Sequence, residues 1–312
     1  MEGTLRMDDP ERFEEFARLA TEQRNPRTFD LDSLDVPRLL ERISAEDHLV
    51  PAAVAAEIPY IAAVVELVVL SLREGGRLIY VGAGTSGRLG VLDASECPPT
   101  FGSSPEQVQG VMAGGYRALV RAVEGAEDRT DDGRNAMDER GIGPKDTVIG
   151  IAASRRTPFV VAALARAREL GARTAYITCT PREEFTLDVD VAICPVVGPE
   201  VIMGSTRMKS GTAQKLVLNM ITTAAFVRMG KLYENMMVDL LANSQKLVER
   251  SRRTVMSVAG VDYDTAARAI EQAGKSVKTA IVMLELSCTR LEAEARLERA
   301  DGFVRAALEA PR

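Results

Sequence analysis

The chain of 312 residues has very few of the side chains that most often carry acid–base and metal chemistry. Its one histidine is His48, and its four cysteines stand far apart without a Cys-x-x-Cys pair. A zinc site is therefore not expected, and neither is a disulfide framework. His48 ends the stretch Ser-Ala-Glu-Asp-His, which is typical of a helix start, so we expect it at the surface or as a cap. Any general acid or base must then come from Glu, Asp, Lys, Tyr or Cys.

The sequence also lacks a basic character and a membrane-spanning run. Its formal net charge is −6 and its isoelectric point lies near 5.2, which argues against a nucleic-acid partner. The most apolar stretch, residues 52–72, is interrupted by Glu57, Pro59 and Glu66, so it is read as a packed helix. The first residues, MEGTLRMDDPERFEEF, contain no apolar signal core. We therefore expect a cytoplasmic protein without a membrane partner.

Apolar, β-branched segments alternate with helical patterns through the middle of the chain. The expected strands are residues 77–81, 108–113, 146–152, 173–179 and 191–196. The expected helices between them are residues 88–94, 118–124, 158–170 and 210–228. This alternation predicts an α/β fold with a doubly wound, parallel, five-stranded sheet. Ligands of such sheets bind at the carboxyl ends of the strands, near the topological switch point.

The two ends of the chain differ from this middle part. The N-terminal residues are expected to form an irregular arm with short helices at 33–43 and 45–56. A further helix over 59–73 should end at Gly75-Gly76. The C-terminal part reads as a small helical bundle with helices at 231–253, 264–274, 276–286 and 291–307. We divide the chain into an N-terminal helical arm (1–58), a sheet domain (59–255) and a small C-terminal helical domain (256–312).

A glycine-rich turn, Gly82-Ala-Gly-Thr-Ser-Gly-Arg88, joins the first strand to the next helix. Glycines let a backbone approach an anion, and the helix start presents free N–H groups. Gly84, Thr85 and Ser86 are therefore candidates for binding a phosphate. The run also matches the dinucleotide fingerprint G-x-G-x-x-G, but no acidic residue ends the second strand about 20 residues on, which argues against NAD. The alternative interpretation is a plain strand–helix turn that binds no ligand.

Two further strand ends carry hydroxyl groups. The segment Ala152-Ala-Ser-Arg-Arg-Thr-Pro158 offers Ser154 and Thr157, which could hold a phosphate or merely cap the helix. Residues 198–212 offer Ser205, Thr206 and Lys209. Capping by the two hydroxyls is again the alternative, although a cap needs no basic neighbour. Several such ends in one sheet favour a shared phosphate site.

Two carboxylates follow the glycine-rich turn. Glu96 stands in Asp-Ala-Ser-Glu-Cys-Pro-Pro, where small residues and a proline pair predict a well-defined loop. Glu127 stands in Val-Glu-Gly-Ala-Glu-Asp. Most glutamates are solvated surface residues, so residue type alone singles out neither. A phosphate loop followed by a titratable group nevertheless favours chemistry on a sugar phosphate over nucleotide storage.

The chain resembles the N-acetylmuramic acid 6-phosphate etherases of the sugar isomerase (SIS) superfamily almost from end to end. The matching strings include Thr21-Glu-Gln-Arg-Asn-Pro, Val81-Gly-Ala-Gly-Thr-Ser-Gly-Arg-Leu-Gly, Asp93-Ala-Ser-Glu-Cys-Pro-Pro-Thr-Phe-Gly, Val123-Glu-Gly-Ala-Glu-Asp, Gly198-Pro-Glu-Val, Gly204-Ser-Thr-Arg-Met-Lys-Ser-Gly-Thr and Lys231-Leu-Tyr-Glu-Asn-Met-Met-Val-Asp-Leu. These strings are long and specific. The family cleaves the D-lactyl ether of its substrate to N-acetylglucosamine 6-phosphate and D-lactate, in the recycling of cell-wall sugars.

The resemblance implies elimination followed by hydration. In the ring-opened sugar a base removes the hydrogen at C2, the C3 oxygen leaves as lactate after protonation, and water adds at C3. Glu96 is implied as the acid at the lactate and Glu127 as the acid/base at C2, with the division of roles open. The hydroxyls of Ser86, Ser154 and Thr157 would hold the 6-phosphate, whereas Thr206 and Lys209 would contact the sugar or its carboxylate. A homodimer with sites near the interface is implied, without metal or cofactor.

One position departs from the family pattern. Arg155 stands where the family usually has glycine, in Ser-Gly-Arg-Thr-Pro. If that glycine needs a positive φ, arginine costs about 1 kcal/mol or more in strain. If the backbone is permissive, the guanidinium strengthens phosphate binding instead. The substitution bears on affinity more than on reaction type.

Two other functions fit the same superfamily. One is a non-catalytic phosphosugar sensor, as in glucokinase regulatory protein, which is a double-domain chain and lacks a counterpart of the Glu96 segment. The other is an aldose–ketose isomerase, which abstracts a C2 proton but needs no acid for a leaving group at C3. The presence of both Glu96 and Glu127 favours the etherase.

Overall fold

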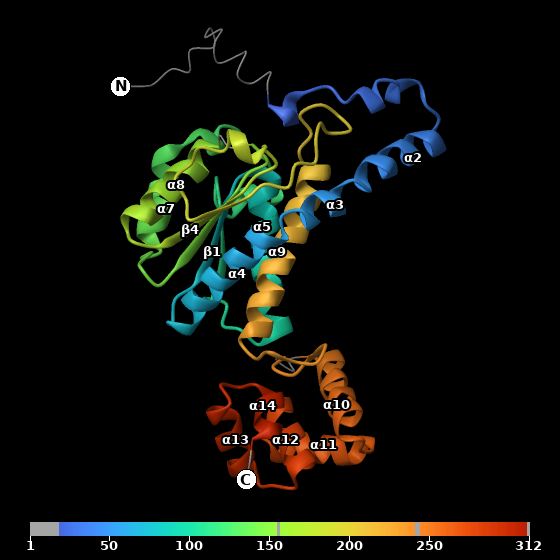
Figure 1. Cartoon of the computed structure of the whole chain (residues 1–312), viewed down its shortest axis with the longest axis vertical. Helices are drawn as coiled ribbons and strands as arrows, with labels where there is room; N and C mark the ends of the chain where they lie inside the picture. The colour runs from blue at the N-terminus through green and yellow to red at the C-terminus, as the bar shows by residue number, and fades with distance from the viewer. Residues whose placement is uncertain (1–18, 155–156, 241–243, 311–312) are drawn as a thin grey trace.

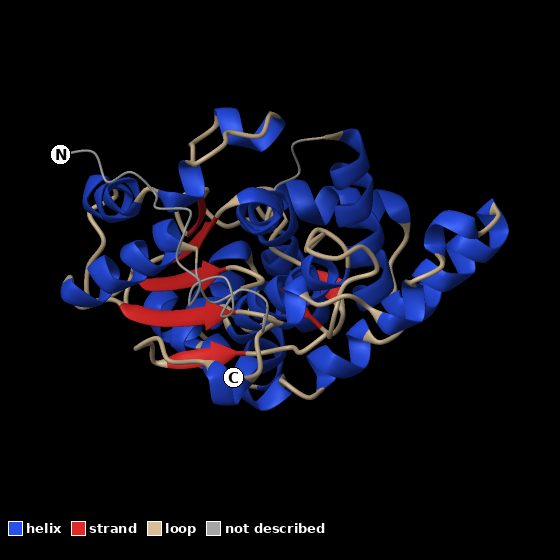
Figure 2. Cartoon of the chain, turned by 90° about the horizontal axis from the view of Figure 1, so that it is seen from above, coloured by secondary structure: helices blue, strands red, loops and turns tan. Residues whose placement is uncertain are grey.

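The computed structural model describes residues 19–154, 157–240 and 244–310. A parallel sheet with helices on both faces forms its centre (Figures 1 and 2). A helical arm precedes the sheet, and a group of short helices follows it (Figure 1). The expected α/β class, with its helical N-terminal and C-terminal parts, is confirmed.

The sheet has five strands in the order β2-β1-β3-β4-β5, and all neighbours are parallel. The strands are β1 (Leu78–Gly82), β2 (Val108–Met112), β3 (Thr147–Ile151), β4 (Arg173–Ile177) and β5 (Val191–Ile193). Every residue of β1 and β3 is buried, as expected for central strands covered on both faces. All five expected strands are present, and their ends differ from the expected ones by at most 3 residues.

Two layers of helices cover the sheet, one on each face (Figure 1). The first layer holds α4 (Ile58–Arg73), α5 (Gly84–Phe101) and α9 (Lys209–Arg228). The second holds α7 (Thr130–Glu139) and α8 (Pro158–Glu169). Because side chains alternate along a strand, Leu78 and Tyr80 pack under the first layer, whereas Ile79 and Val81 pack under the second. The sequence pattern does not predict α7, because only Gly133 and Met137 of its ten residues are buried.

Helix α5 is longer than the sequence indicates, and this corrects the expected position of Glu96. The pattern predicts a helix over 88–94 followed by a loop, but α5 continues to Phe101 and carries Glu96 within it. Pro98 and Pro99 lie in its last turn, where each removes one helical hydrogen bond because proline has no N–H. The stacking of Phe101 on Phe226, with ring centroids 4.6 Å apart, holds this end of the helix.

The N-terminal arm consists of short 3-10 turns and two helices before α4. Helix α2 (Val36–Asp47) extends away from the sheet, whereas α3 (Val50–Ala55) lies against α9 (Figure 1). Val36 and Leu40 on α2 remain exposed. In the described ranges, no single helix is long and apolar enough to cross a membrane. The pair formed by α2–α3 and α4, bent by 60°, reaches that length and apolarity only when both parts are counted.

The C-terminal part differs from the expectation at two places. The expected helix over 231–253 is instead a hairpin of β6 (Leu232–Tyr233) and β7 (Met236–Met237), followed by α10 (Gln245–Ala259). Glu234 has a φ of 52°, which suits a tight turn and not a helix. The expected helix over 291–307 is two helices, because Asp301 and Gly302 both have positive φ.

The C-terminal helices are α10, α11 (Tyr263–Gln272), α12 (Val277–Leu286), α13 (Arg290–Arg299) and α14 (Val304–Glu309). They share one apolar core, to which Val255 of α10 and Val238 of the preceding loop belong. This core is separate from the two cores of the sheet. The division of the chain after residues 58 and 255 stays a prediction.

Candidate active site

The loops after β1 and β3 lie at the topological switch point of the sheet. From β1 the chain moves outward to β2, and it then returns to the other side of β1 as β3. The last residues of the two strands, Gly82 and Ile151, are direct partners. The loops that carry Ser86 and Ser154 therefore begin side by side, where ligands of such sheets bind.

The start of α5 is shaped to receive an anion. Gly82 and Gly87 touch closely, since a Cβ added to Gly87 would lie 2.7 Å from the carbonyl oxygen of Gly82. Gly84, the first helical residue, has a φ of +53°, a conformation that favours glycine. No side chain caps α5, whose N-cap residue is Ala83. The first N–H groups of the helix are thus available to a ligand.

The start of α8 is similar. Thr157 occupies the N-cap position, but its hydroxyl makes no capping hydrogen bond, so capping is wrong as its explanation. The carbonyl of Ser154 accepts a hydrogen bond of 3.2 Å from the hydroxyl of Tyr176. Ser154 itself is half-buried. Arg155, the departure from the family pattern, lies outside the described residues.

The start of α9, in contrast, is closed by a carboxylate. Glu200 is fully buried and accepts hydrogen bonds of 2.9 Å from the backbone N–H groups of both Lys209 and Ser210. Ser205 and Thr206 do not cap α9, so that alternative is wrong too, and both side chains are half-buried. Of these three helices, α5 and α8, the two at the switch point, therefore begin without such a carboxylate in the described part of the chain.

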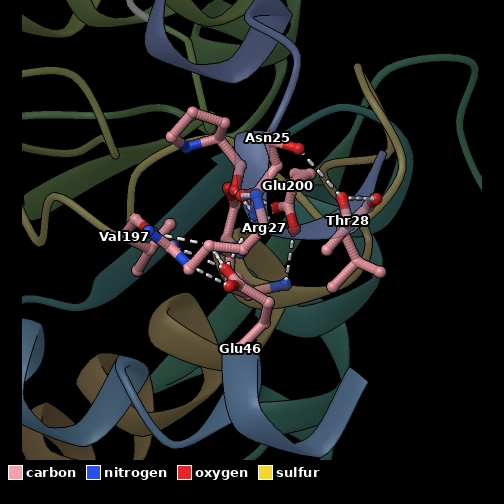
Figure 3. A network of polar contacts seen from close by, with 10 residues as sticks. Asn25, Arg27, Thr28, Glu46, Val197 and Glu200 are labelled. Atoms are coloured by element: carbon pink, nitrogen blue, oxygen red, sulfur yellow. Dashed lines mark hydrogen bonds and ion pairs between the residues drawn. The ribbon is translucent and has the colours of Figure 1, made fainter. Parts of the chain in front are cut away.

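Lys209 belongs to a buried polar network (Figure 3). Its ammonium is 0% exposed and donates to Glu46 Oε2 at 2.7 Å and to the carbonyl of Val197 at 2.9 Å. Glu46 also accepts hydrogen bonds from Arg27 and from Asn25. The Arg27 guanidinium, with Lys209 and Asn25, lowers the pKa of Glu46 to about 2. The structure thus joins Lys209 to the N-terminal arm and not to the glycine-rich loop, and its contact with a substrate stays a prediction.

The N-terminal arm also supports the backbone of the segment 197–204. The Thr28 hydroxyl donates to the carbonyl of Val201 at 2.9 Å, and the Asn25 amide donates to the carbonyl of Pro199 at 3.2 Å. The N–H of Gly204 donates to the carbonyl of Thr21 at 3.1 Å. Residues 21–28 therefore hold the loop that carries Ser205 and Thr206. The sequence analysis did not predict that residues 21–28 support this loop. The available signal was Lys209, because a lysine that becomes buried needs a carboxylate partner.

Helix α9 brings that loop to the glycine-rich turn. A Cβ added to Gly211 would lie 3.4 Å from Cγ2 of Thr85 and 3.5 Å from the carbonyl oxygen of Thr206. One turn further, Gln214 Oε1 accepts a hydrogen bond of 2.9 Å from the Ser86 hydroxyl. Thr85, Ser86 and Thr206 therefore meet where α5 and α9 begin.

Glu127 lies beside the same helix start. It belongs to a 3-10 turn, Ala126–Asp128, and lines a cavity of about 160 Å³ together with Gly84 and Arg88. Arg88 is held by hydrogen bonds to the carbonyls of Ala118 and Leu119. Glu127, an exposed residue, thus lines the cavity that adjoins the glycine-rich turn.

Glu96 lies at the far end of α5. It follows Gly84 by twelve positions, which places it about 18 Å further along the helix axis. Its carboxylate is exposed on the outer side of the helix. The inner side is fixed by Asp93, which accepts hydrogen bonds from Tyr80 and Asn219, and burial raises the pKa of Asp93. Within one chain, the structure does not place Glu96 at the cavity that Glu127 lines.

Comparison with known proteins identifies the family. The model of the glucokinase regulatory protein N-terminal SIS domain matches residues 60–168, and that of the SIS domain matches residues 132–224. An N-acetylmuramic acid 6-phosphate etherase of Salinibacter ruber is 58% identical over 303 residues, which cover 97% of each chain. The chain belongs to the N-acetylmuramic acid 6-phosphate etherase family.

A second etherase agrees with this assignment. An N-acetylmuramic acid 6-phosphate etherase of a Geobacillus species is 51% identical over 292 residues, which cover 94% of this chain and 99% of that one. A solved phosphoheptose isomerase of Francisella tularensis superposes with a TM-score of 0.46 at 15% identity, over 62% of this chain and 98% of that one. The family expected from the sequence strings is confirmed.

In this member of the etherase family, most of the predicted site residues gather in one place. The starts of α5, α8 and α9 are close to the glycine-rich turn, Ser154, Thr157, Ser205, Thr206 and Glu127. Lys209 lies apart from this group because it pairs with Glu46. Glu96 lies apart because it is about 18 Å further along α5. In the part of the chain that the structure describes, no group of three His, Cys, Asp or Glu side chains is arranged to hold a metal ion.

Proposed function

We propose that this protein is a carbon–oxygen lyase that cleaves the D-lactyl ether of N-acetylmuramic acid 6-phosphate. The products are N-acetylglucosamine 6-phosphate and D-lactate, and the reaction serves the recycling of cell-wall sugars. The observation that carries the proposal is the 58% identity to the Salinibacter ruber etherase over 97% of both chains. We place the reaction in the cytoplasm, with a small phosphosugar as the partner and neither nucleic acid nor membrane involved.

The 6-phosphate is assigned to the switch point between α5 and α8. The N-cap residues of both helices, Ala83 and Thr157, make no capping hydrogen bond, and helix starts favour anions. Ser86, Ser154 and Thr157 supply hydroxyl donors, and the backbone around Gly84 and Thr85 supplies N–H groups. Ser205 and Thr206 are assigned to the sugar, because α9 carries them to the edge of the same site.

The chemistry is assigned to two carboxylates. In the ring-opened sugar the C2 hydrogen is acidified by the neighbouring aldehyde, and the carboxylate of Glu127 takes it as a proton. The C2–H electron pair forms the C2–C3 double bond while the C3–oxygen bond breaks. The lactate oxygen receives that bond's electrons and a proton from the carboxyl of Glu96. Water then adds at C3, and a proton returns to C2.

The position of Glu96 supports a site that is shared between two subunits of a homodimer. A hexose 6-phosphate is too short to reach from the start of α5 to Glu96, about 18 Å along the same helix. Glu96 shares the outer side of α5 with Leu92, and the adjacent α9 exposes Met220 and Val227. An apolar face of this kind suits a second copy of the chain, whose Glu96 would complete the site.

The first test is lactate release from N-acetylmuramic acid 6-phosphate by the purified protein in D₂O. D-lactate is expected, together with N-acetylglucosamine 6-phosphate that carries deuterium at C2. Saturable binding of the phosphosugar without lactate release would refute the etherase and favour a sensor. Lactate release without deuterium at C2 would refute proton abstraction at that carbon.

The second test separates a shared site from a site within one chain. Glu96→Gln and Glu127→Gln are each expected to abolish lactate release while the fold and phosphate binding persist. If the site is shared, a purified dimer with one chain of each variant has one intact site and about half of the wild-type activity. An inactive mixed dimer would show that both carboxylates act from the same chain.

A further inference from the structure

Gln214 carries a buried donor without a partner. The residue is 1% exposed and lies on α9 against the start of α5. Its Oε1 accepts a hydrogen bond from Ser86, but its Nε2 has no hydrogen-bond partner in the described part of the chain. A buried N–H group without a partner costs about 1–3 kcal/mol, so native structures rarely keep one.

The same hydrogen bond sets the direction of the Ser86 hydroxyl. A serine hydroxyl has one proton to donate, and in this structure that proton is directed to Gln214 Oε1 at 2.9 Å. A phosphate oxygen at neutral pH mainly accepts hydrogen bonds. Ser86 therefore cannot donate to a phosphate while it donates to Gln214. The liganded site needs a different arrangement of these two side chains.

We propose that Gln214 is a positioning residue that turns the Ser86 hydroxyl toward a bound phosphate. When the phosphate arrives, the Ser86 O–H rotates to a phosphate oxygen. The amide of Gln214 turns by half a rotation, and its Nε2–H donates to Oγ of Ser86. The unpartnered donor thus gains an acceptor, and the hydroxyl that receives this bond becomes a stronger donor. The proposal rests on the proposed function only in assigning the 6-phosphate to Ser86.

Gln214 lies in a closely packed part of α9. The neighbouring Ala213 and Val217 are fully buried and fix this side of α9, while Gly211 packs on Thr85. The amide therefore stays at Ser86 and has two orientations of nearly equal shape. After the rotation, Oε1 takes the position without a partner, and proteins tolerate an unpaired carbonyl more readily than an unpaired N–H.

The test measures phosphate affinity in two variants that differ in their ability to donate. Gln214→Met keeps the length of the side chain and removes the amide. Gln214→Glu keeps the shape, and its new carboxyl can donate to Ser86 only when it is protonated. Thr212→Val is the control, because Thr212 is exposed on the same helix and its hydroxyl donates to the Met208 carbonyl. Calorimetry with inorganic phosphate and with N-acetylglucosamine 6-phosphate gives each affinity relative to wild type at the same pH.

Gln214→Met is expected to weaken both ligands about tenfold, the value of one hydrogen bond, while Thr212→Val binds as wild type does. Gln214→Glu is expected to bind nearly as wild type at low pH and to lose affinity as the new carboxyl ionises. The phosphate and the nearby charged residues Arg88 and Glu127 are the same in both proteins, so the ratio of the two affinities isolates the effect of residue 214. A packing role would instead give a loss that does not depend on pH.

Three results would overturn the proposal: wild-type affinity in Gln214→Met, a loss in Gln214→Glu that is equal at every pH, or a wild-type protein that binds neither ligand. Urea unfolding of each variant shows whether a loss of affinity reflects a loss of fold. If wild type binds both ligands but releases no lactate, the etherase assignment fails and the binding data still decide the role of Gln214.

Discussion

Glu46→Gln is expected to destabilise the fold strongly, because Glu46 is the carboxylate of a buried ion pair. It removes the negative charge from the buried network, so the Lys209 ammonium, which is 0% exposed, keeps neutral acceptors such as the Val197 carbonyl but loses its ion pair. Breaking a buried ion pair by removing one partner costs about 3–5 kcal/mol. The lowering of the Glu46 pKa from 4.5 to about 2 gives a similar value, about 3 kcal/mol at 1.36 kcal/mol per unit.

The pH dependence of this loss has a defined sign. The folded protein lowers the pKa of Glu46, so its carboxylate stabilises the fold fully above the unfolded pKa near 4.5. That contribution falls as the pH drops from about 4.5 toward about 2, where the folded carboxyl is protonated too. The difference in free energy of unfolding between wild type and Glu46→Gln should therefore be largest near neutral pH and shrink in acid.

Urea unfolding at several pH values measures this difference. Glu169→Gln is the matched control, because Arg134 and Arg166 likewise lower the pKa of Glu169 to about 2. Glu169 is exposed, however, and solvent screens its ion pairs, so its loss should be far smaller. Equal urea midpoints for wild type and Glu46→Gln at neutral pH would refute the reasoning.

Two further predictions concern the glycine-rich turn and the thiols. Gly87→Ala would put a Cβ 2.7 Å from the Gly82 carbonyl oxygen, so we expect a loss of about 1–3 kcal/mol and weaker phosphate binding. Gly143→Ala, where an added Cβ meets nothing within 4 Å, is the control, and equal urea midpoints for the two variants would contradict the prediction. Burial raises the pKa of the Cys97 and Cys179 thiols to about 12, so neither should react with iodoacetamide at pH 8 until the protein unfolds. Mass spectrometry of labelled peptides checks this, and rapid native labelling of either thiol would count against it.

Features that depend on neighbouring residues were predictable from the sequence. The five strands follow from short apolar, β-branched runs, and the turn from Gly82 to Arg88 follows from its glycines. The proximity of that turn to the Ser154 loop follows from the parallel sheet. The end of α5 did not follow, because the proline pair indicates a break that the stacking of Phe101 on Phe226 overrides.

The sequence by itself determined the fold class, the family strings and the chemical types of the site residues, because each rests on local order along the chain. Only the tertiary structure decided which of these groups meet. Lys209 pairs with a carboxylate 163 positions away, so it is not free at the site in the way its motif indicates. Glu96 is separated from Glu127 by the rigid length of α5. Such pairings depend on burial and on distance in space, and local sequence order specifies neither.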